Sequence, residues 1–383
     1  MDTATQLTPG ETTGTPDGFF ARLHAFREQH AKKEIALFFT AGFLFDVFTL
    51  DRIDSVLTLA QQGGYLVMLL GLLLYEQRHE LKLARPGKWV ERAWRFSEDA
   101  LHFLLGSLLS SFSLFYFKSA SGIAALGFLG FTFAVLVANE LPRFRRLGHV
   151  VRVGLFAFCV TSFLSYVVPI AFGFLSPWLF LLAASLSAAV GYGVFHWVRR
   201  WGGNPWAMRR IGAPYGGVVG VMLGAYFLGA VPPIPVHAEK LGIYHEVTAE
   251  KLEGGKREYL LLHQRPWWKV WQRGDQTFHA RPGDRAYVFV SVFAPTKFAD
   301  QVRVKWRYKD VKRGWVDQGP GTLLSVVGGR DQGFRTFAYN SDPRPGKWEA
   351  QVLTDDGRVI GEIGMTVLED PSTEPRTFLE ERY

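Results

Sequence analysis

Acidic, basic and amide side chains recur around the first two apolar stretches of the chain. A carboxylate near a cation can bind a lipid headgroup or act as a general base, and charges within apolar stretches are costly enough to mark functional sites. The simpler interpretation is that two helices end here and that Asp46 pairs with Arg52 or reaches water. The functional interpretation is a polar cup formed by Asp46, Asp51, Arg52, Asp54, Gln61, Gln62 and Lys118.

A second cluster of candidate residues is aromatic and basic. Residues 265–273 read Arg-Pro-Trp-Trp-Lys-Val-Trp-Gln-Arg, so Trp267, Trp268 and Trp271 alternate with Arg265 and Lys269. Three interpretations are open. The segment enters a membrane–water interface, where Trp and basic residues are favoured; it binds a sugar or a protein partner; or it supplies core tryptophans. Single-stranded nucleic acids also select such surfaces, but the location derived below argues against them.

The sequence shows none of the common catalytic or metal-binding motifs. A GxSxG elbow, a nucleotide-binding phosphate loop and a GxGxxG fingerprint are all absent. The histidines of the C-terminal part are too far apart in sequence for HxH or HExxH, and Cys159 is the only cysteine. We therefore expect no metal and no cofactor, and we favour a protein without enzymatic activity over an enzyme.

The elements that carry the polar cup are apolar and long. A helix needs about 20 residues to cross about 30 Å of hydrocarbon, and a soluble helix is seldom apolar on all faces. We predict an α-helical membrane bundle of about seven transmembrane helices within residues 34–231, at 35–50, 56–75, 101–117, 123–139, 151–170, 178–198 and 213–231. Residues 1–33 are expected to be a cytoplasmic tail that includes a possible amphipathic helix.

Charge predicts the orientation of these helices. Residues 1–235 hold 20 Lys and Arg against 14 Asp and Glu, whereas residues 236–383 hold 23 against 21. Most of the basic residues that precede position 235 lie in alternate loops, and the other loops carry only Arg52 and Lys118. The positive-inside rule then predicts a cytoplasmic N-terminus, and seven crossings place the C-terminal part outside.

The last apolar stretch has three glycines four residues apart, Gly216, Gly220 and Gly224. Glycines at this spacing share one helical face and let another helix approach closely. Packing within the bundle is the simpler interpretation. The other is a homo-oligomer that forms through this seventh helix.

The C-terminal part changes period and composition. Pro232, Pro233 and Pro235 end the last helix and begin a stiff linker, expected at residues 232–243. Residues 244–370 then contain a β-rich run at 286–293 and short runs in which apolar and polar residues alternate, such as 302–308 and 347–352, and Asp356–Gly357 marks a hairpin turn. These runs predict an all-β, immunoglobulin-like sandwich. Residues 371–383 are polar and are expected to form a loose tail.

Two segments of this β-rich part resemble a known family. Residues 345–361, Pro-Gly-Lys-Trp-Glu-Ala-Gln-Val-Leu-Thr-Asp-Asp-Gly-Arg-Val-Ile-Gly, and 304–308, Val-Lys-Trp-Arg-Tyr, are similar to the bacterial domain of unknown function 2914. The resemblance extends from about residue 276 to residue 368. It implies a bacterial protein in which such a domain follows a multi-pass membrane region. It therefore implies an inner-membrane location and a periplasmic C-terminal domain, and it implies no catalytic residue.

Two functions follow from these observations. The leading hypothesis is a non-enzymatic inner-membrane protein whose periplasmic sandwich recognises an envelope component: a protein, a glycan or a lipid-linked precursor. The alternative is an integral-membrane enzyme or lipid transporter that uses the polar cup at the outer ends of helices 1–3. The expected partners are the lipid bilayer and an envelope protein or glycan.

Overall fold

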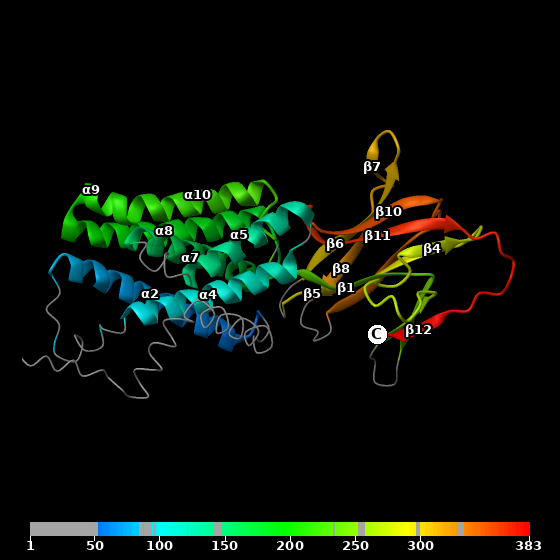
Figure 1. Ribbon diagram of the computed structural model, residues 1–383, viewed down its shortest axis with the longest axis horizontal. Coiled ribbons are helices and arrows are strands. Elements are labelled where there is room, and N and C mark those ends of the chain that lie inside the picture. The colour runs from blue at the N-terminus through cyan, green and yellow to red at the C-terminus, as the bar shows by residue number, and fades with distance from the viewer. Residues whose placement is uncertain are drawn as a thin grey trace, which may run out of the picture. The chain divides into compact units, whose positions relative to one another are not determined.

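The computed structural model describes residues 53–83, 87, 94, 97–120, 122–140, 148–232, 234–251, 257–295, 299–327 and 333–383. The expected N-terminal tail and the first predicted span lie outside these residues. The N-terminal half is helical and the C-terminal part is β-rich (Figure 1). The helices are α2 (Val56–Glu80), α4 (Ser97–Ser119), α5 (Gly122–Glu140), α7 (His149–Phe172), α8 (Pro177–Gly202), α9 (Asn204–Ala207), the π-helix η1 (Met208–Gly212) and α10 (Ala213–Phe227).

Four of the described helices are long and apolar enough to cross a membrane: α2, residues 100–119 of α4, α7 and α8. The run from α9 through η1 to α10 is continuous from 204 to 227 but is interrupted by the π turn. Pro214 has no N–H to donate to the carbonyl of Arg210, and a π turn is one way for a helix to accommodate that missing bond. The seventh predicted span, residues 213–231, corresponds to α10, which begins at the predicted residue and ends four residues earlier, at Phe227.

Helix α7 is the centre of the helical part. Every residue from Phe156 to Ser162 is buried, and α7 contacts α2, α4, α8 and α10. Its polar side chains find partners on these neighbours. Thr161 and Ser187 of α8 share a hydrogen bond of 2.8 Å, and the Tyr116 hydroxyl of α4 donates to Ser162 at 3.1 Å. Such bonds fasten helices together where water is absent.

The β-rich part has twelve described strands, and their bounds are as follows: β1 (His237–Tyr244), β2 (Glu246–Lys251), β3 (Arg257–His263), β4 (Thr277–Ala280), β5 (Ala286–Phe293), β6 (Ala299–Asp310), β7 (Gly314–Asp317), β8 (Thr322–Val327), β9 (Phe334–Asn340), β10 (Gly346–Thr354), β11 (Val359–Glu369) and β12 (Leu379–Arg382). They form three sheets, with strand orders β1-β5-β9, β4-β11-β10-β6-β7 with β8 also on β6, and β12-β3-β2. The pairing of β4 with β11 is parallel.

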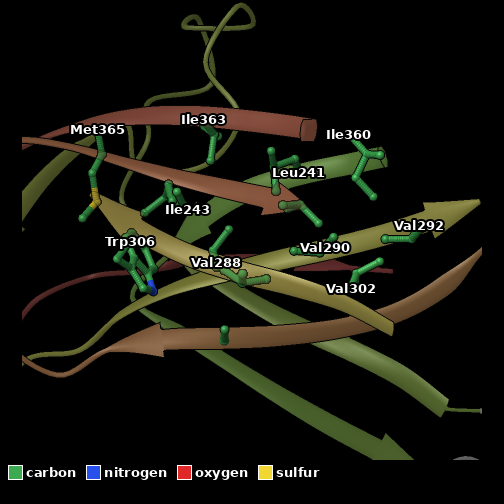
Figure 2. Close-up of a cluster of buried hydrophobic side chains, with 14 of the residues drawn as sticks. Leu241, Ile243, Val288, Val290, Val292, Val302, Trp306, Ile360, Ile363 and Met365 are labelled. Carbon is green, nitrogen blue, oxygen red and sulfur yellow. The ribbon is translucent and has the colours of Figure 1, made fainter. Parts of the chain in front are cut away.

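Strand β5 lies in the middle sheet and is buried on both faces. Val288, Val290 and Val292 join the core shared with the six-stranded sheet, where Trp306 also lies (Figure 2). Phe289, on the opposite face, joins a smaller aromatic core with the third sheet. A strand covered on both sides reads as a nearly continuous apolar run, which is what residues 286–293 show apart from Ser291.

The β-rich character was predicted, but the arrangement differs from the expected two-sheet sandwich. The expected linker at 232–243 ends earlier, because β1 begins at His237. The Asp356–Gly357 turn is confirmed as the connection between the antiparallel strands β10 and β11. The tail at 371–383 was expected to be loose, yet its strand β12 pairs with β3 and forms one edge of the third sheet.

Candidate functional site

The tryptophan-rich segment is an exposed loop, residues 264–276, which we call the W-loop. It connects β3 to β4. The side chains of Trp267, Trp268, Val270 and Trp271 are 83, 52, 77 and 67% exposed. The interpretation as core tryptophans is therefore wrong. The rings of Trp268 and Trp271 meet edge-on at 5.7 Å, and the Lys269 ammonium lies 5.3 Å from the Trp268 ring.

A buried acid holds the two ends of the W-loop together. The carboxylate of Asp275, which is 2% exposed, accepts the backbone N–H of Gln264 at 2.9 and 3.0 Å. Its Oδ2 atom also lies 2.7 Å from Nδ1 of His245. The His245 ring is stacked on Phe278 at 4.1 Å. Because both side chains are buried, this pair supports the loop and is closed to a substrate.

Backbone bonds fix the base of the W-loop to β1. The Ile243 N–H donates to the carbonyl of Arg273 at 3.1 Å, and the Asp275 N–H donates to the carbonyl of Ile243 at 2.7 Å. Between them, Gly274 has a φ of 72°, and a Cβ built there would lie 1.9 Å from the Ile243 oxygen. Only glycine fits such a close approach.

Arg265 occupies the inside of the loop. Its guanidinium donates to the carbonyls of Lys269 at 3.1 Å and Gln272 at 2.7 Å. Arg265, a member of the candidate binding segment, therefore shapes the loop. The tryptophans point outward on a fixed frame, which is the arrangement expected of an aromatic binding surface.

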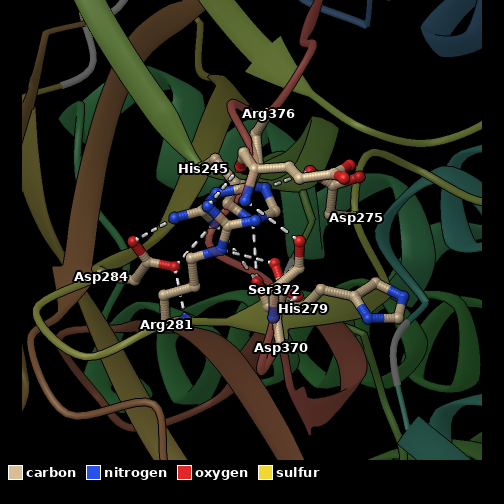
Figure 3. Close-up of polar contacts among 9 residues, drawn as sticks. His245, Asp275, His279, Arg281, Asp284, Asp370, Ser372 and Arg376 are labelled. Atoms are coloured by element: carbon tan, nitrogen blue, oxygen red, sulfur yellow. Dashed lines mark hydrogen bonds and ion pairs between the residues drawn. The ribbon is translucent and has the colours of Figure 1, made fainter.

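The C-terminal residues 370–383, which we call the C-terminal strap, brace the same region (Figure 3). Arg376 donates to both carboxylate oxygens of Asp284 at 2.7 and 2.8 Å, and Arg281 pairs with Asp370 at 2.6 Å. Partial burial acts to raise the pKa of Asp284, but the bonds from Arg376 and from the Arg281 amide hold it below its usual value. The sequence contained no signal for these long-range pairs.

The polar cup is only partly within the described residues. Asp46, Asp51 and Arg52 lie outside them. Asp54 precedes α2. Gln61 is exposed and donates to the Tyr65 hydroxyl at 3.1 Å. Gln62 is buried instead and accepts from the Tyr166 hydroxyl of α7.

Lys118, the last member of the predicted cup, is exposed near the end of α4. Burial, together with the positive charge of Lys118, lowers the pKa of His237 at the start of β1 to about 4. The adjacent residues Gln61 and Gln62 therefore differ in their surroundings, since one is exposed and the other is buried. The charge of Lys118 affects the protonation of His237 in β1. The cup itself stays a prediction.

The glycine face of α10 is open within the described residues. No described atom lies within 4 Å of a Cβ built at Gly216, Gly220 or Gly224. The tight position is Gly191 of α8, where a Cβ would lie 2.4 Å from the Tyr215 ring. Packing of α10 therefore depends on a glycine of its neighbour, which the sequence spacing did not indicate.

A cluster of charges that the sequence reasoning missed lies at the C-terminal end of α2. Oε2 of Glu76 lies 3.0 Å from Nδ1 of His149, and Arg152 pairs with the other oxygen. One turn later, Glu80 pairs with Arg210 of η1. The side chains of Glu76 and Arg152 are 14 and 15% exposed. Among the described residues, no group of three or more His, Cys, Asp and Glu side chains is arranged to hold a metal.

Comparison with known proteins identifies part of the β-rich region. Residues 299–367 match the family model described as a protein of unknown function (DUF2914). The chain carries a C-terminal DUF2914 domain. That domain spans β6 to most of β11, and the W-loop precedes it.

The other comparisons carry no functional information. No curated protein matches the chain significantly. The solved structure of Pseudomonas fluorescens alkylpurine DNA glycosylase AlkC, bound to DNA containing an abasic site analog, aligns at 12% identity over 78% of this chain and 76% of that chain. Its TM-score is 0.19, so this likeness supports no argument.

Proposed function

We propose that this is a non-enzymatic membrane protein whose β-rich part binds a component of the cell envelope through the W-loop. The observation that supports this proposal most directly is a set of exposed apolar side chains, at Trp267, Trp268, Val270 and Trp271. They lie on a loop whose backbone is held by hydrogen bonds from Arg265. Water-exposed aromatic groups gathered in this way are typical of binding surfaces, and their rigidity lowers the entropy that binding costs.

The proposed location follows from charge and from helix composition. The protein would lie in a bacterial inner membrane, with seven crossings, a cytoplasmic N-terminus and a periplasmic C-terminal part. Four apolar described helices and the DUF2914 match support this proposal. The distribution of basic residues between alternate loops gives the orientation.

The test compares a W-loop variant with a matched surface variant. The variant Trp267→Ala/Trp268→Ala/Trp271→Ala removes exposed rings and leaves Arg265, Gly274 and Asp275 in place. The control Leu323→Ala/Leu368→Ala removes exposed apolar groups elsewhere on the β-rich part. Both are crosslinked in native membranes, purified in mild detergent and examined by mass spectrometry for bound proteins, glycans and lipids.

We expect the wild type and the control to retain the same bound component and the W-loop variant to lose most of it. Truncating a binding hot spot costs about 2 kcal/mol or more, which is roughly 30-fold in affinity. Retention of the component by a folded W-loop variant would refute the W-loop as the binding surface.

A further inference from the structure

Helices α2 and α8 are in contact and end at the same end of the helical part, where α9 lies (Figure 1). The Arg78 guanidinium, in the last turn of α2, lies 5.5 Å from the ring centroid of Trp201 of α8. The Trp201 ring lies 6.2 Å from the ring of Trp197, one turn earlier. Arg78 is exposed and Trp197 is 54% exposed. An arginine of one helix and two tryptophans of the other therefore form one continuous surface.

A second arginine, Arg200, is exposed beside Trp201. It follows Trp197 by three positions, and helical spacing places residues three apart on the same side of a helix. Among the described residues, no acidic side chain forms an ion pair with Arg78 or Arg200. This surface therefore carries two positive charges that have no negative partner.

The nearby acid Glu80 is occupied by another arginine. Glu80 pairs with Arg210 of η1, whose guanidinium also lies 5.5 Å from the Trp206 ring centroid. Trp206 packs on the end of α8, since a Cβ built at Gly202 would lie 2.5 Å from its ring. These contacts fix the turn from α8 to η1 against α2 and use the carboxylate that follows Arg78 by two positions.

An apolar seam between α2 and α8 leads away from the two arginines. On α8, exposed apolar side chains recur four and seven positions apart, which keeps them on one face with Trp201; they are Leu186, Val190 and Trp197. On α2, Leu74 and Gly71 share a face with Arg78. Leu74 lines a small cavity together with Val194 of α8, and no described atom lies within 4 Å of a Cβ built at Gly71. The described residues thus leave this seam open.

This arrangement fits a phospholipid with a net negative headgroup. Guanidinium groups donate strong hydrogen bonds to phosphate oxygens, and tryptophan rings are favoured at the depth of the headgroups. Basic pockets between transmembrane helices are typical sites for anionic headgroups. A soluble anion would use the arginines but not the apolar seam, and a zwitterionic lipid carries a cation of its own.

We infer that the ends of α2 and α8 hold an anionic phospholipid, with its headgroup at Arg78 and Arg200 and an acyl chain in the seam. This inference goes beyond the proposed function and does not involve the W-loop. It rests on the proposed membrane location, and the proposed orientation places the site in the cytoplasmic leaflet.

The test uses the full-length protein, purified in detergent and freed of bound lipid. It is titrated with phosphatidylglycerol or with phosphatidylcholine that has the same acyl chains, and native mass spectrometry measures the bound lipid. Because the measurement is made in detergent, it does not depend on which leaflet the site faces.

Three variants are compared with the wild type. The variant Arg78→Gln/Arg200→Gln removes the two cations that have no acidic partner. The matched control Arg199→Gln/Arg209→Gln removes the same charge close by in sequence; Arg199 contacts His196 of its own helix. The variant Trp197→Ala keeps every charge and shortens the apolar face of the seam.

We expect the wild type and the control to bind phosphatidylglycerol roughly tenfold more tightly than phosphatidylcholine. Arg78→Gln/Arg200→Gln should lose most of this preference, because both lipids then bind only through their acyl chains. Trp197→Ala should weaken the binding of both lipids. A wild type without preference, or an equal loss in the control, overturns the inference, and unchanged binding by Trp197→Ala overturns the place of the acyl chain.

Thermal unfolding without lipid shows whether each variant is folded. If the double arginine variant is not, Arg200→Gln replaces it, because Arg200 has no described ion pair to lose; full preference in that variant overturns the inference. A photocrosslinker at position 190 that reacts with residues 35–50 and not with lipid would assign the seam to the first predicted span, which also overturns it.

The inference and the proposed function fail separately. The variant Trp267→Ala/Trp268→Ala/Trp271→Ala should bind phosphatidylglycerol as the wild type does. Loss of the envelope component with retained lipid preference supports both proposals, whereas a wild type without lipid preference leaves the W-loop proposal standing.

Discussion

At the residue scale, Gly274 is the position on which the W-loop depends. Its left-handed backbone brings it against the carbonyl of Ile243, and the bonds on either side of it join the loop to β1. A side chain there must displace backbone, because no flexible group is in the way. One glycine therefore controls how the three tryptophans are presented.

We predict that Gly274→Ala releases the base of the W-loop. Gly283→Ala is the matched control, since Gly283 also has a positive φ of 89° but has open space at its Cβ position. The control should cost about 1 to 2 kcal/mol of local strain. Gly274→Ala should raise hydrogen exchange of the Ile243 and Asp275 amides by about tenfold or more above the control. Equal exchange in both variants would contradict the proposed close contact.

The sequence predicted the tryptophans as candidates but not the residues that hold them. Alternation of Trp with Arg and Lys is visible in nine consecutive residues. His245 and Asp275 are 30 positions apart, and no periodicity connects them. Arg265 was grouped with the tryptophans as a candidate binding residue, yet its bonds to two carbonyls turn it inward.

At the element scale, the C-terminal strap shows where composition misleads. Residues 371–383 are mostly polar, so burial could not be inferred from them. They are ordered by pairs with distant residues, chiefly Arg376 with Asp284 and the strand β12 with β3. Apolar runs, in contrast, located α2, α7, α8 and β5 within a few residues of their ends, because elements that are apolar on all faces keep apolar residues along their whole length.

We predict that the strap loosens in acid. Asp284 has a folded pKa below its ordinary value of 3.8, so its bond to Arg376 contributes fully above that value and is lost as the pH falls through the lower folded pKa. Hydrogen exchange of residues 370–383, corrected for intrinsic rates, should accelerate as the pH falls below 3.8, relative to neutral pH.

The variant Asp284→Asn should reproduce that loosening at neutral pH and expose Arg376 to trypsin. Asp317→Asn is the control, because Asp317 also pairs with two basic residues but lies on β7, away from the strap. If Asp284→Asn leaves trypsin cleavage at Arg376 at the wild-type rate, the ion pair is not what holds the strap.

At the scale of the whole molecule, the number of crossings decides which parts share a compartment. An odd number places the two ends on opposite sides of the membrane, and an even number places them on the same side. Residues 35–50 lie outside the described residues, so this span rests on hydropathy alone, and the charge pattern of the loops is the independent argument for seven.

We predict that the two ends of the chain lie on opposite sides of the membrane. Alkaline phosphatase joined by a flexible linker after residue 383 should be active, and green fluorescent protein at the same place should be dark, because the first folds outside the cytoplasm and the second within it. The same reporters at residue 1 should give the reverse result. Matching signals at both ends would show an even number of crossings, and an inactive alkaline phosphatase after residue 383 would withdraw the periplasmic location.

The position of β12 as the last strand added to the third sheet also has a consequence for biosynthesis. His263 of β3 and Leu379 of β12 are paired although 116 positions (379 − 263) separate them. At ordinary translation rates this interval lasts on the order of ten seconds. During that time the nascent β3 has one neighbouring strand instead of two, so its free edge is open to pairing with another chain. This edge must stay protected during the interval if the β-rich part is to fold as a single copy.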